Sequence, residues 1–218
     1  MAFDLDGLPA PPDLRNWGFA EGLVKEPEAA RAGRLRAPEI GANFVSPATG
    51  AALSFLASTL GAKQIVEIGT GVGTAIPWLL RGMAADGQIT TLDADGEHHR
   101  VAKELVAGLP GHVRFITGKP LDVLPRLADR SYDLAVLSLP SADLSAAADE
   151  ALRLLKVGGV LAMTDALGDG KVGDPAQRDP ATVSRRLLVQ RLADDIRLHL
   201  SLLPVGDGLL VAKLHTVA

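Results

Sequence analysis

The stretch Gln64-Ile65-Val66-Glu67-Ile68-Gly69-Thr70-Gly71-Val72-Gly73-Thr74-Ala75 decides the fold of this chain. Its apolar beginning predicts a short buried strand, its glycines predict a tight turn, and the apolar run that follows predicts a helix. Glycines at positions 69, 71 and 73 leave one side of the turn without Cβ atoms. A ligand could therefore lie against bare backbone and the amides of the helix N-terminus. This order of elements indicates a site for a nucleotide-like ligand.

Strands and helices alternate around this stretch. The predicted strands are short apolar runs over residues 65–68, 88–92, 113–116, 133–137, 160–163, 196–203 and 209–214. The predicted helices cover residues 47–60, 76 to about 85, 97–109, 121–127, 142–155 and 182–194. The alternation predicts a doubly wound α/β fold, with a mostly parallel seven-stranded sheet and helices on both faces. The last two strands are joined by only Pro204–Gly208, which predicts a C-terminal antiparallel hairpin.

The length of 218 residues predicts a single domain over residues 1–218, with an N-terminal helical extension at about residues 1–60. Residues 1–15 are rich in Pro, Asp and Gly and are expected to be irregular, before a charged helical segment over 16–35. Ser46 is expected to cap the next helix, with Pro47 at its first position. The Gly- and Asp-rich run 168–180 predicts a surface loop, either mobile and exposed or part of a substrate lid.

Composition narrows the classes of function. Hydrophobic residues make up 47% of the chain, and the formal net charge is −4, which provides no basic surface for nucleic acid. The absence of cysteine excludes thiolate zinc sites and cysteine nucleophiles. No apolar run approaches the roughly 20 residues of a membrane span, and the acidic, proline-broken N-terminus is unlike a signal peptide. We therefore expect a cytoplasmic protein that binds neither nucleic acid nor membrane.

The residues around the glycine turn narrow the ligand. The dinucleotide fingerprint requires glycine at its first, third and sixth positions, but the sixth position counted from Gly69 is Thr74. A phosphate-binding loop would end in Gly-Lys-Ser or Gly-Lys-Thr, which is not found here. Asp93, at the end of the next predicted strand, could accept hydrogen bonds from both hydroxyls of a ribose. These residues favour a nucleoside with a tail other than a phosphate.

Several segments resemble one enzyme family. They are Val45–Gly50 (VSPATG), Val66–Gly71 (VEIGTG), Thr91–Asp95 (TLDAD), Ile116–Gly118 (ITG), Tyr132–Leu134 (YDL) and Gly170–Pro175 (GKVGDP). With the closing hairpin they are similar to class I S-adenosylmethionine-dependent methyltransferases, and within that class to the bacterial branch of the catechol and caffeoyl-CoA O-methyltransferase family. The resemblance covers about residues 40–214. It implies that the chain binds S-adenosylmethionine and, because the family is commonly dimeric, that it forms a homodimer.

The resemblance also implies the cofactor-binding residues, which are Val45, Glu67, Gly69, Thr70, Gly71, Ala75, Asp93, Ala94, Pro120 and Ser138. Val45 would close over the methionine end of the cofactor, and Glu67 with the turn would line its amino-acid portion. Asp93 would hold the ribose. Ala94 and Pro120 would flank the adenine, and Ser138 would lie beside the reactive sulfonium.

The chain departs from this family at the metal site. The family's Mg²⁺-type cation is held by an Asp after the fourth strand and an Asp-Asn pair after the fifth, and the aligned residues here are Ser138, Thr164 and Asp165. The family's assisting lysine aligns with Ser141. Because Mg²⁺ and Ca²⁺ require several hard oxygen ligands, usually with more than one carboxylate, we expect no tightly bound metal at this degenerate site. Asp165 is the candidate catalytic base.

Three hypotheses for the function stay open. The first is S-adenosylmethionine-dependent methyl transfer to a hydroxyl of a small acceptor, aromatic or not, without a tightly bound metal. The second is a metal-assisted, catechol-type transfer in which substrate, water or another carboxylate supplies the missing ligands. The third is a catalytically lapsed homodimer that still binds the cofactor.

Two expectations concern single side chains near the turn. Trp78 follows Pro77 in an apolar run and is expected in the core rather than against the cofactor. His98 and His99 lie among charged residues near a helix N-terminus and are expected to be solvated.

Overall fold

The computed structural model describes residues 13–215, in which seven strands form one sheet of order β3-β2-β1-β4-β5-β7-β6. The strands pair in parallel from β3 through β5, whereas β7 is antiparallel to both β5 and β6. The predicted doubly wound sheet and its C-terminal hairpin are therefore confirmed. The strand bounds are β1 Gln64–Ile68, β2 Gln88–Asp93, β3 His112–Thr117, β4 Tyr132–Leu137, β5 Leu155–Met163, β6 Leu198–Leu203 and β7 Leu209–Leu214.

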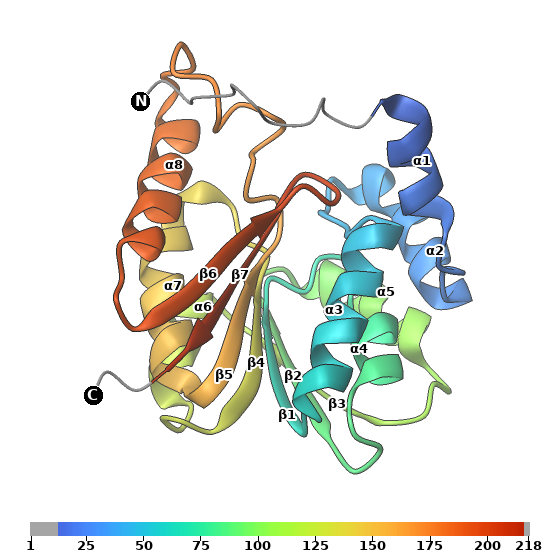
Figure 1. Ribbon diagram of the computed structural model, residues 1–218. Coiled ribbons are helices and arrows are strands. Elements are labelled where there is room, and N and C mark those ends of the chain that lie inside the picture. The colour runs from blue at the N-terminus through green and yellow to red at the C-terminus, as the bar shows by residue number, and fades with distance from the viewer. Residues whose placement is uncertain (1–12, 216–218) are drawn as a thin grey trace.

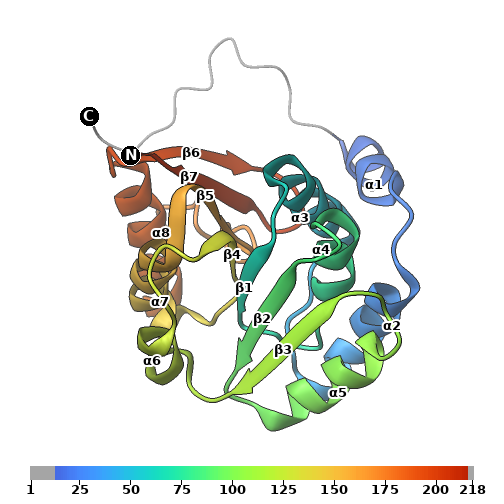
Figure 2. The same cartoon turned by 90° about the horizontal axis from the view of Figure 1, so that it is seen from below.

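Helices cover both faces of the sheet (Figure 1 and Figure 2). One face carries α6, α7 and α8, and the other carries α3, α4 and α5, with α2 packed against α5. The bounds are α1 Leu14–Gly22, α2 Glu28–Arg36, η1 Ala37–Ile40, α3 Pro47–Leu60, α4 Ile76–Gly82, α5 Gly96–Val106, α6 Pro120–Val123, η2 Leu124–Arg126, α7 Ser141–Leu154 and α8 Pro180–Ala193. Most of the segment expected to be irregular, residues 1–12, lies outside the described residues.

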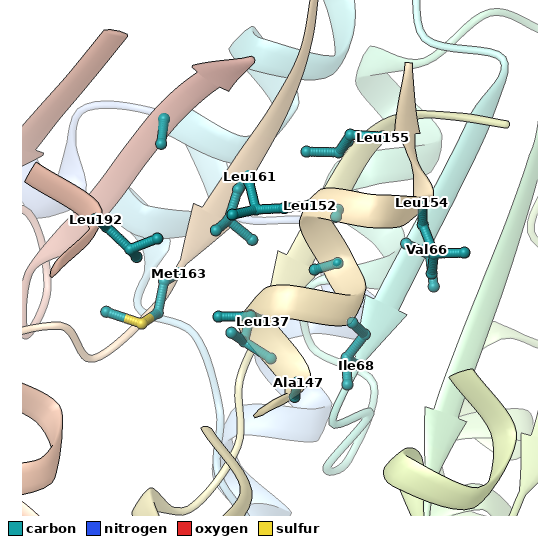
Figure 3. Packing of buried hydrophobic residues seen from close by; sticks show 14 of the residues in the cluster. Val66, Ile68, Leu137, Ala147, Leu152, Leu154, Leu155, Leu161, Met163 and Leu192 are labelled. Atoms are coloured by element: carbon teal, nitrogen blue, oxygen red, sulfur yellow. The ribbon is translucent and has the colours of Figure 1, made fainter. Parts of the chain in front are cut away.

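Strand β1 lies in the middle of the sheet and divides the core between the two faces. Its side chains alternate, as in any strand, so Val66 and Ile68 join the cluster under α7 and α8. Figure 3 shows these two residues in the same cluster as Leu137 of β4 and Leu161 of β5. Ile65 packs on the opposite face with Trp78 of α4, which is fully buried as predicted. The alternation places Glu67 on the same face as Ile65, at the carboxyl end of the strand.

The helix starts follow their capping residues, whereas some element ends differ from the prediction. The backbone N–H of Thr49 donates to Ser46 Oγ at 3.2 Å, and Pro47 opens α3, which confirms the predicted cap. Strand β5 begins at Leu155 rather than at residue 160, because the register shifts opposite Tyr132 and the strand continues past Gly158, which has φ 87°. Helices α4 and α5 end about three residues earlier than predicted.

The loop over residues 168–180 is anchored on one side. Arg186 of α8 donates to the backbone carbonyls of Lys171, Val172, Asp174 and Gln177 at 2.7–3.3 Å. One guanidinium, whose five N–H groups form a rigid fork, thus holds much of the loop against α8. The loop ends at Asp179, whose side chain accepts from the N–H of Thr182 and caps α8.

The contact between α3 and α4 depends on a glycine. A Cβ on Gly50 would lie 2.3 Å from the indole Nε1 of Trp78, which is rigid and buried. We expect Gly50→Ala to lower the free energy of unfolding by about 1–3 kcal/mol through overpacking. Gly18→Ala in α1 is the matched control, because no atom lies within 4 Å of its added methyl and alanine favours the helix. Urea denaturation of both variants measures the difference. Equal stability of the two would contradict this account.

Candidate active site

The carboxyl ends of the parallel strands meet at one edge of the sheet. Connections from β1 and β4 leave in opposite directions along the sheet, so a crevice is expected between these two strand ends. The residues at this edge are Glu67 and the glycine turn after β1, Asp93 at the end of β2, Ser138 after β4, and Thr164 with Asp165 after β5. The predicted site residues therefore come together from separate parts of the chain.

The glycines of the turn are required by close contacts with the protein itself. Gly69 and Gly71 have φ of 93° and 51°, in the left-handed region. A Cβ on Gly69 would lie 2.2 Å from the carbonyl oxygen of Ser138, and one on Gly71 would lie 2.6 Å from that of Asn43. A Cβ on Gly73 would meet Ala102 of α5 at 2.7 Å. The Cβ side of each of these glycines therefore faces the protein itself, and contact of the turn with a ligand stays a prediction.

The amides of the turn are also largely used within the protein. Gly69 and Thr70 donate to the carbonyl of Leu92, and Gly71 donates to Asp93 Oδ2 at 2.9 Å. The turn is therefore fastened to the end of β2. A ligand here depends on side chains around the turn more than on its backbone N–H groups.

A narrow cavity lies against the turn. It is lined by Val45, Glu67, Gly69, Thr70, Gly71, Ala75 and Ser138, together with Thr164 and Asp165, and its volume of about 10 Å³ is close to the least that holds one water molecule. The segment 43–45, which we call the strap, forms part of its wall. The N–H of Val45 donates to Thr74 Oγ1 at 3.0 Å and holds the strap in place. Seven of the ten predicted cofactor-binding residues thus line one cavity.

Glu67 is the buried carboxyl of this cavity. Its side chain is 1% exposed, and Thr91 of β2 donates to its Oε2 at 2.5 Å. Burial raises the pKa of Glu67 to about 8, Thr91 lowers it, and the charge of Asp93 adds to the rise. Among the described residues no hydrogen bond reaches Oε1, so one oxygen of a buried carboxyl is available to a ligand.

Asp93 is partly buried, and its carboxylate has little spare capacity. Oδ2 accepts from the N–H of Gly71, whereas Oδ1 accepts from the N–H of Asp95 and lies 3.2 Å from His98 Nδ1. A carboxylate has about four lone-pair positions, so one further hydrogen bond fits without rearrangement and a second requires His98 to move. The sequence prediction of two ribose contacts did not include these partners.

Ala94 and Pro120 lie beside Asp93 but outside the narrow cavity. Ala94 follows Asp93 and is exposed, and Pro120 is buried at the first position of α6. The N–H of Gly118 donates to the carbonyl of Asp93 at 2.9 Å, which brings the start of α6 to the end of β2. The adenine position implied by the resemblance is therefore at the outer side of the glycine turn.

His99 does not behave as expected from the sequence. It is 1% exposed rather than solvated, and it contacts Thr70 of the turn and Thr117 of β3. Its place near a helix N-terminus among charges indicated solvent, but the helix turns this residue inward, edge-on to Phe115. A period-3.6 reading with Val101 and Ala102 as buried neighbours could have identified it.

The residues aligned with the family's metal site fit a metal poorly. Ser138 Oγ and Thr164 Oγ1 are hydrogen-bonded to each other at 2.7 Å, so each hydroxyl already has a partner. Asp165 is the one carboxylate of the three, and no cluster of three His, Cys, Asp or Glu suited to a metal occurs among the described residues. Hard cations such as Mg²⁺ and Ca²⁺ require several oxygen ligands, so these three side chains alone make a poor binding site for them.

Asp165 stands between two cavities. Its backbone has φ 51°, a left-handed conformation that Asp tolerates better than most residues. Burial raises the pKa of its carboxyl, the charge of Asp207 raises it further, and Arg185 opposes this. Arg185 Nη1 donates to the carbonyl of Asp165 at 2.6 Å and fixes the backbone.

The second cavity is wider and opens beside the first, with a volume of about 440 Å³ that suits a small organic molecule. Its aromatic lining residues are Trp17 and Phe44, and its charged ones are Asp165, Asp169, Arg185 and Asp207. Helix α1 contributes Trp17 because Glu21 fastens it, accepting from the N–H groups of Ala48 and Gly206 at 3.0 and 3.1 Å. Sequence reasoning missed Trp17 and Glu21, since α1 carries no motif.

The comparisons with known proteins agree with this geometry. Residues 31–214 match the model of a family described as O-methyltransferase. The chain belongs to this family.

Relatives match the O-methyltransferase along nearly its whole length. A Mycobacterium tuberculosis protein named "Probable O-methyltransferase" is 41% identical over 213 residues, which cover 96% of this chain and 95% of that protein. A solved structure from Corynebacterium glutamicum has a TM-score of 0.83 and 33% identity, covering 92% of this chain and 95% of that one. An O-methyltransferase from Bacillus cereus, in complex with SAH, has a TM-score of 0.79 and 25% identity, covering 90% and 95%.

No helix in residues 13–215 of the O-methyltransferase is long and apolar enough to cross a membrane.

The buried Glu67 should make the stability of the unliganded O-methyltransferase depend on pH. Because folding raises the pKa of this carboxyl from 4.5 to about 8, its contribution is fully present below pH 4.5 and is lost as the pH rises through 8. We expect Glu67→Gln to become progressively more stable than wild type between pH 5 and 8, by up to about 1.4 kcal/mol per pH unit.

Chemical denaturation at several pH values measures this difference, with Glu39→Gln as the control at an exposed position. A difference between Glu67→Gln and wild type that does not change with pH would show that the carboxyl is not buried as described.

Proposed function

We propose that this protein transfers a methyl group from S-adenosylmethionine to a hydroxyl of a small acceptor, without a tightly bound metal. The observation that carries the proposal is the Glu67 carboxyl, buried at the glycine turn with one oxygen available, next to the wider cavity beyond Asp165. Relatives across the whole chain support the same reaction, and the B. cereus neighbour is in complex with SAH, the demethylated product of this cofactor.

The residues at the strand ends each contact a different part of the cofactor. Glu67 Oε1 accepts from the cofactor's ammonium group, and Asp93 accepts from a ribose hydroxyl through its remaining lone pair. Ala94 and Pro120 flank the adenine. Val45, Gly69, Thr70, Gly71 and Ala75 enclose the methionine end, with Ser138 beside the sulfur. These roles follow the family resemblance and agree with the positions of the side chains.

Binding requires the strap to move. The narrow cavity holds about one water molecule, so the methionine end of the cofactor fits only if residues 43–45 shift outward. Such a shift breaks the hydrogen bond from Val45 to Thr74, which contributes about 1 kcal/mol, and it also exposes part of the buried Val45 side chain. Once the strap closes again, Val45 and Phe44 separate the reaction from water.

The chemistry needs alignment and a base. When bound, S-adenosylmethionine supplies a methyl group on a positively charged sulfur. The acceptor lies in the wider cavity between Trp17 and Phe44, which orient it toward the narrow one. Asp165 lines both cavities and takes the proton from the acceptor hydroxyl, and its raised pKa makes it a stronger base than an exposed aspartate. Ser138 and Thr164 stay paired beside it.

Cofactor binding should be coupled to loss of a proton from Glu67. The cofactor's ammonium group pairs with the ionised carboxylate of Glu67, whose pKa in the unliganded protein is about 8. We therefore expect the affinity for SAH to fall by up to about tenfold per pH unit below pH 8. Calorimetric titration with SAH from pH 6 to 9 measures this slope. In Glu67→Gln the affinity should be weaker and free of this pH dependence.

The same titration tests the assignment of the cofactor. We expect Asp93→Ala to weaken SAH binding, because the variant loses both the ribose acceptor and the anchor of the turn at Gly71. No binding of SAH to the wild type, or unchanged binding in Asp93→Ala, would remove the cofactor from the proposal.

Asp165→Asn should separate catalysis from binding. Asparagine also tolerates the left-handed backbone of this position, so the variant keeps the fold. We expect kcat to fall by about 10²–10⁴ while the Kd for SAH stays within about twofold. The readout is methyl transfer to acceptors found in a screen of phenols and alcohols, and Asp86→Asn, exposed at the opposite end of the sheet, is the control. Unchanged kcat would exclude Asp165 as the base.

Addition of EDTA to the same assay addresses the metal, and activity should be unchanged. Loss of activity with EDTA would favour the metal-assisted alternative. Tight SAH binding with no turnover across the screen would favour a catalytically lapsed protein. The homodimer and the cytoplasmic location stay predictions.

A further inference from the structure

A chain of hydrogen-bonded side chains runs through the interior from Glu67 to the end of β3. Thr91 Oγ1 donates to Glu67 and lies 2.6 Å from Thr70 Oγ1. Thr70 Oγ1 lies 3.0 Å from His99 Nε2, and His99 Nδ1 lies 2.7 Å from Thr117 Oγ1. The first four of these five residues are at most 4% exposed. The proposed reaction assigns His99 no part.

The fold brings these residues together by register. Glu67 and Thr91 are direct partners in the pairing of β1 with β2, so their side chains lie side by side on one face. Helix α5 crosses this face and places the ring of His99 edge-on to Phe115, with ring centroids 5.3 Å apart. The imidazole is thereby held with one nitrogen toward the glycine turn and the other toward β3.

The single proton of each hydroxyl sets the direction of the chain. Thr91 uses its proton on Glu67, so it accepts from Thr70, and Thr70 in turn must accept from His99. His99 therefore carries a proton on Nε2, and in the neutral ring Nδ1 accepts from Thr117. An ionised Glu67 thus requires a proton on Nε2 of His99.

The surroundings of His99 favour this neutral form. Burial lowers the pKa of His99, Asp93 raises it, and the nearby ammonium group of Lys103 lowers it further. The other neighbours of the ring are uncharged, since Thr70, Phe115 and Thr117 provide hydroxyls and an aromatic edge. A neutral imidazole with its proton on Nε2 donates to Thr70 through that nitrogen and accepts from Thr117 through Nδ1.

We propose that His99 is a positioning residue of the cofactor site: through Thr70 and Thr91 it holds Glu67 Oε2, so that Oε1 stays available to the cofactor's ammonium group. The inference rests on the proposed function for its ligand. His99 thereby orients the carboxyl of Glu67 although its own side chain does not line the cavity. It also links the turn that carries Thr70 to the carboxylate, so both are ordered together.

Two amide variants of His99 test the direction of the chain. In His99→Gln the amide nitrogen can reach the place of Nε2 and still donate to Thr70, whereas the shorter side chain in His99→Asn can replace only the contact of Nδ1 with Thr117. We expect His99→Gln to bind SAH within about threefold of wild type and His99→Asn to bind it about tenfold or more weakly. Equal Kd values for the two variants would overturn the proposal, and the NMR measurements below separate a hydrogen-bonding effect from the smaller volume of asparagine.

Nitrogen-15 NMR of the histidine side chains tests the wild type without any substitution. In the complex with SAH, His99 should be neutral with its proton on Nε2. A proton on Nδ1, or a charged ring at pH 8, would overturn the proposal. The protonation of wild-type His99 observed by NMR also tests the proposal if either His99 variant fails to fold.

Titration of the unliganded protein separates this inference from the proposed function. The carboxyl carbon of Glu67, followed by NMR, should titrate at higher pH in His99→Asn than in His99→Gln, by about half a unit or more, because the donor chain to the carboxylate is broken. Identical midpoints would overturn the role of His99. If the wild type binds no SAH, the proposed function fails, while this titration still reports on the chain.

Discussion

The structure depends on the close approach of backbones at the glycine turn after β1. The turn passes so near Ser138, Asn43 and Ala102 that a Cβ at Gly69, Gly71 or Gly73 would collide with each of them. These three contacts lie at the end of β4, on the strap and on α5. The turn after β1 therefore packs against all three of these segments at the carboxyl edge of the sheet. Glu67 precedes the turn and is thereby buried. Burial raises the pKa of its carboxyl to about 8, and a cationic ligand that pairs with the ionised form must lower this pKa.

This burial connects stability with binding. A buried carboxyl with a strongly raised pKa lowers the free energy of unfolding at neutral pH. A cation that pairs with the carboxylate on binding offsets this loss. The neighbouring hydroxyls and His99 direct hydrogen bonds toward one oxygen of the carboxyl and leave the other available. In the proposed function this free oxygen is the one that accepts from the cofactor's ammonium group.

The wider cavity is organised differently. Ser138 and Thr164 are hydrogen-bonded to each other, so two of the positions where the family resemblance implies a metal form a small polar contact instead. Asp165 lies beside a cavity that Trp17, Phe44 and two further aspartates, Asp169 and Asp207, also line. Of the three residues aligned with the metal site only Asp165 is a carboxylate, so these three positions are poorly suited to holding a hard cation.

The sequence by itself determined the order of strands and helices, the antiparallel hairpin, and the residues at the strand ends, because these follow from local periodicity, connection length and glycine spacing. Only the tertiary structure decided where the glycines' bare sides face, that His99 is buried, and that Glu21 brings Trp17 to the wider cavity. Each of these depends on partners far away in the chain: Gly71 meets Asn43, His99 meets Thr70, and Glu21 meets Gly206. Local patterns carry no information about such contacts, since they arise only once the sheet has assembled.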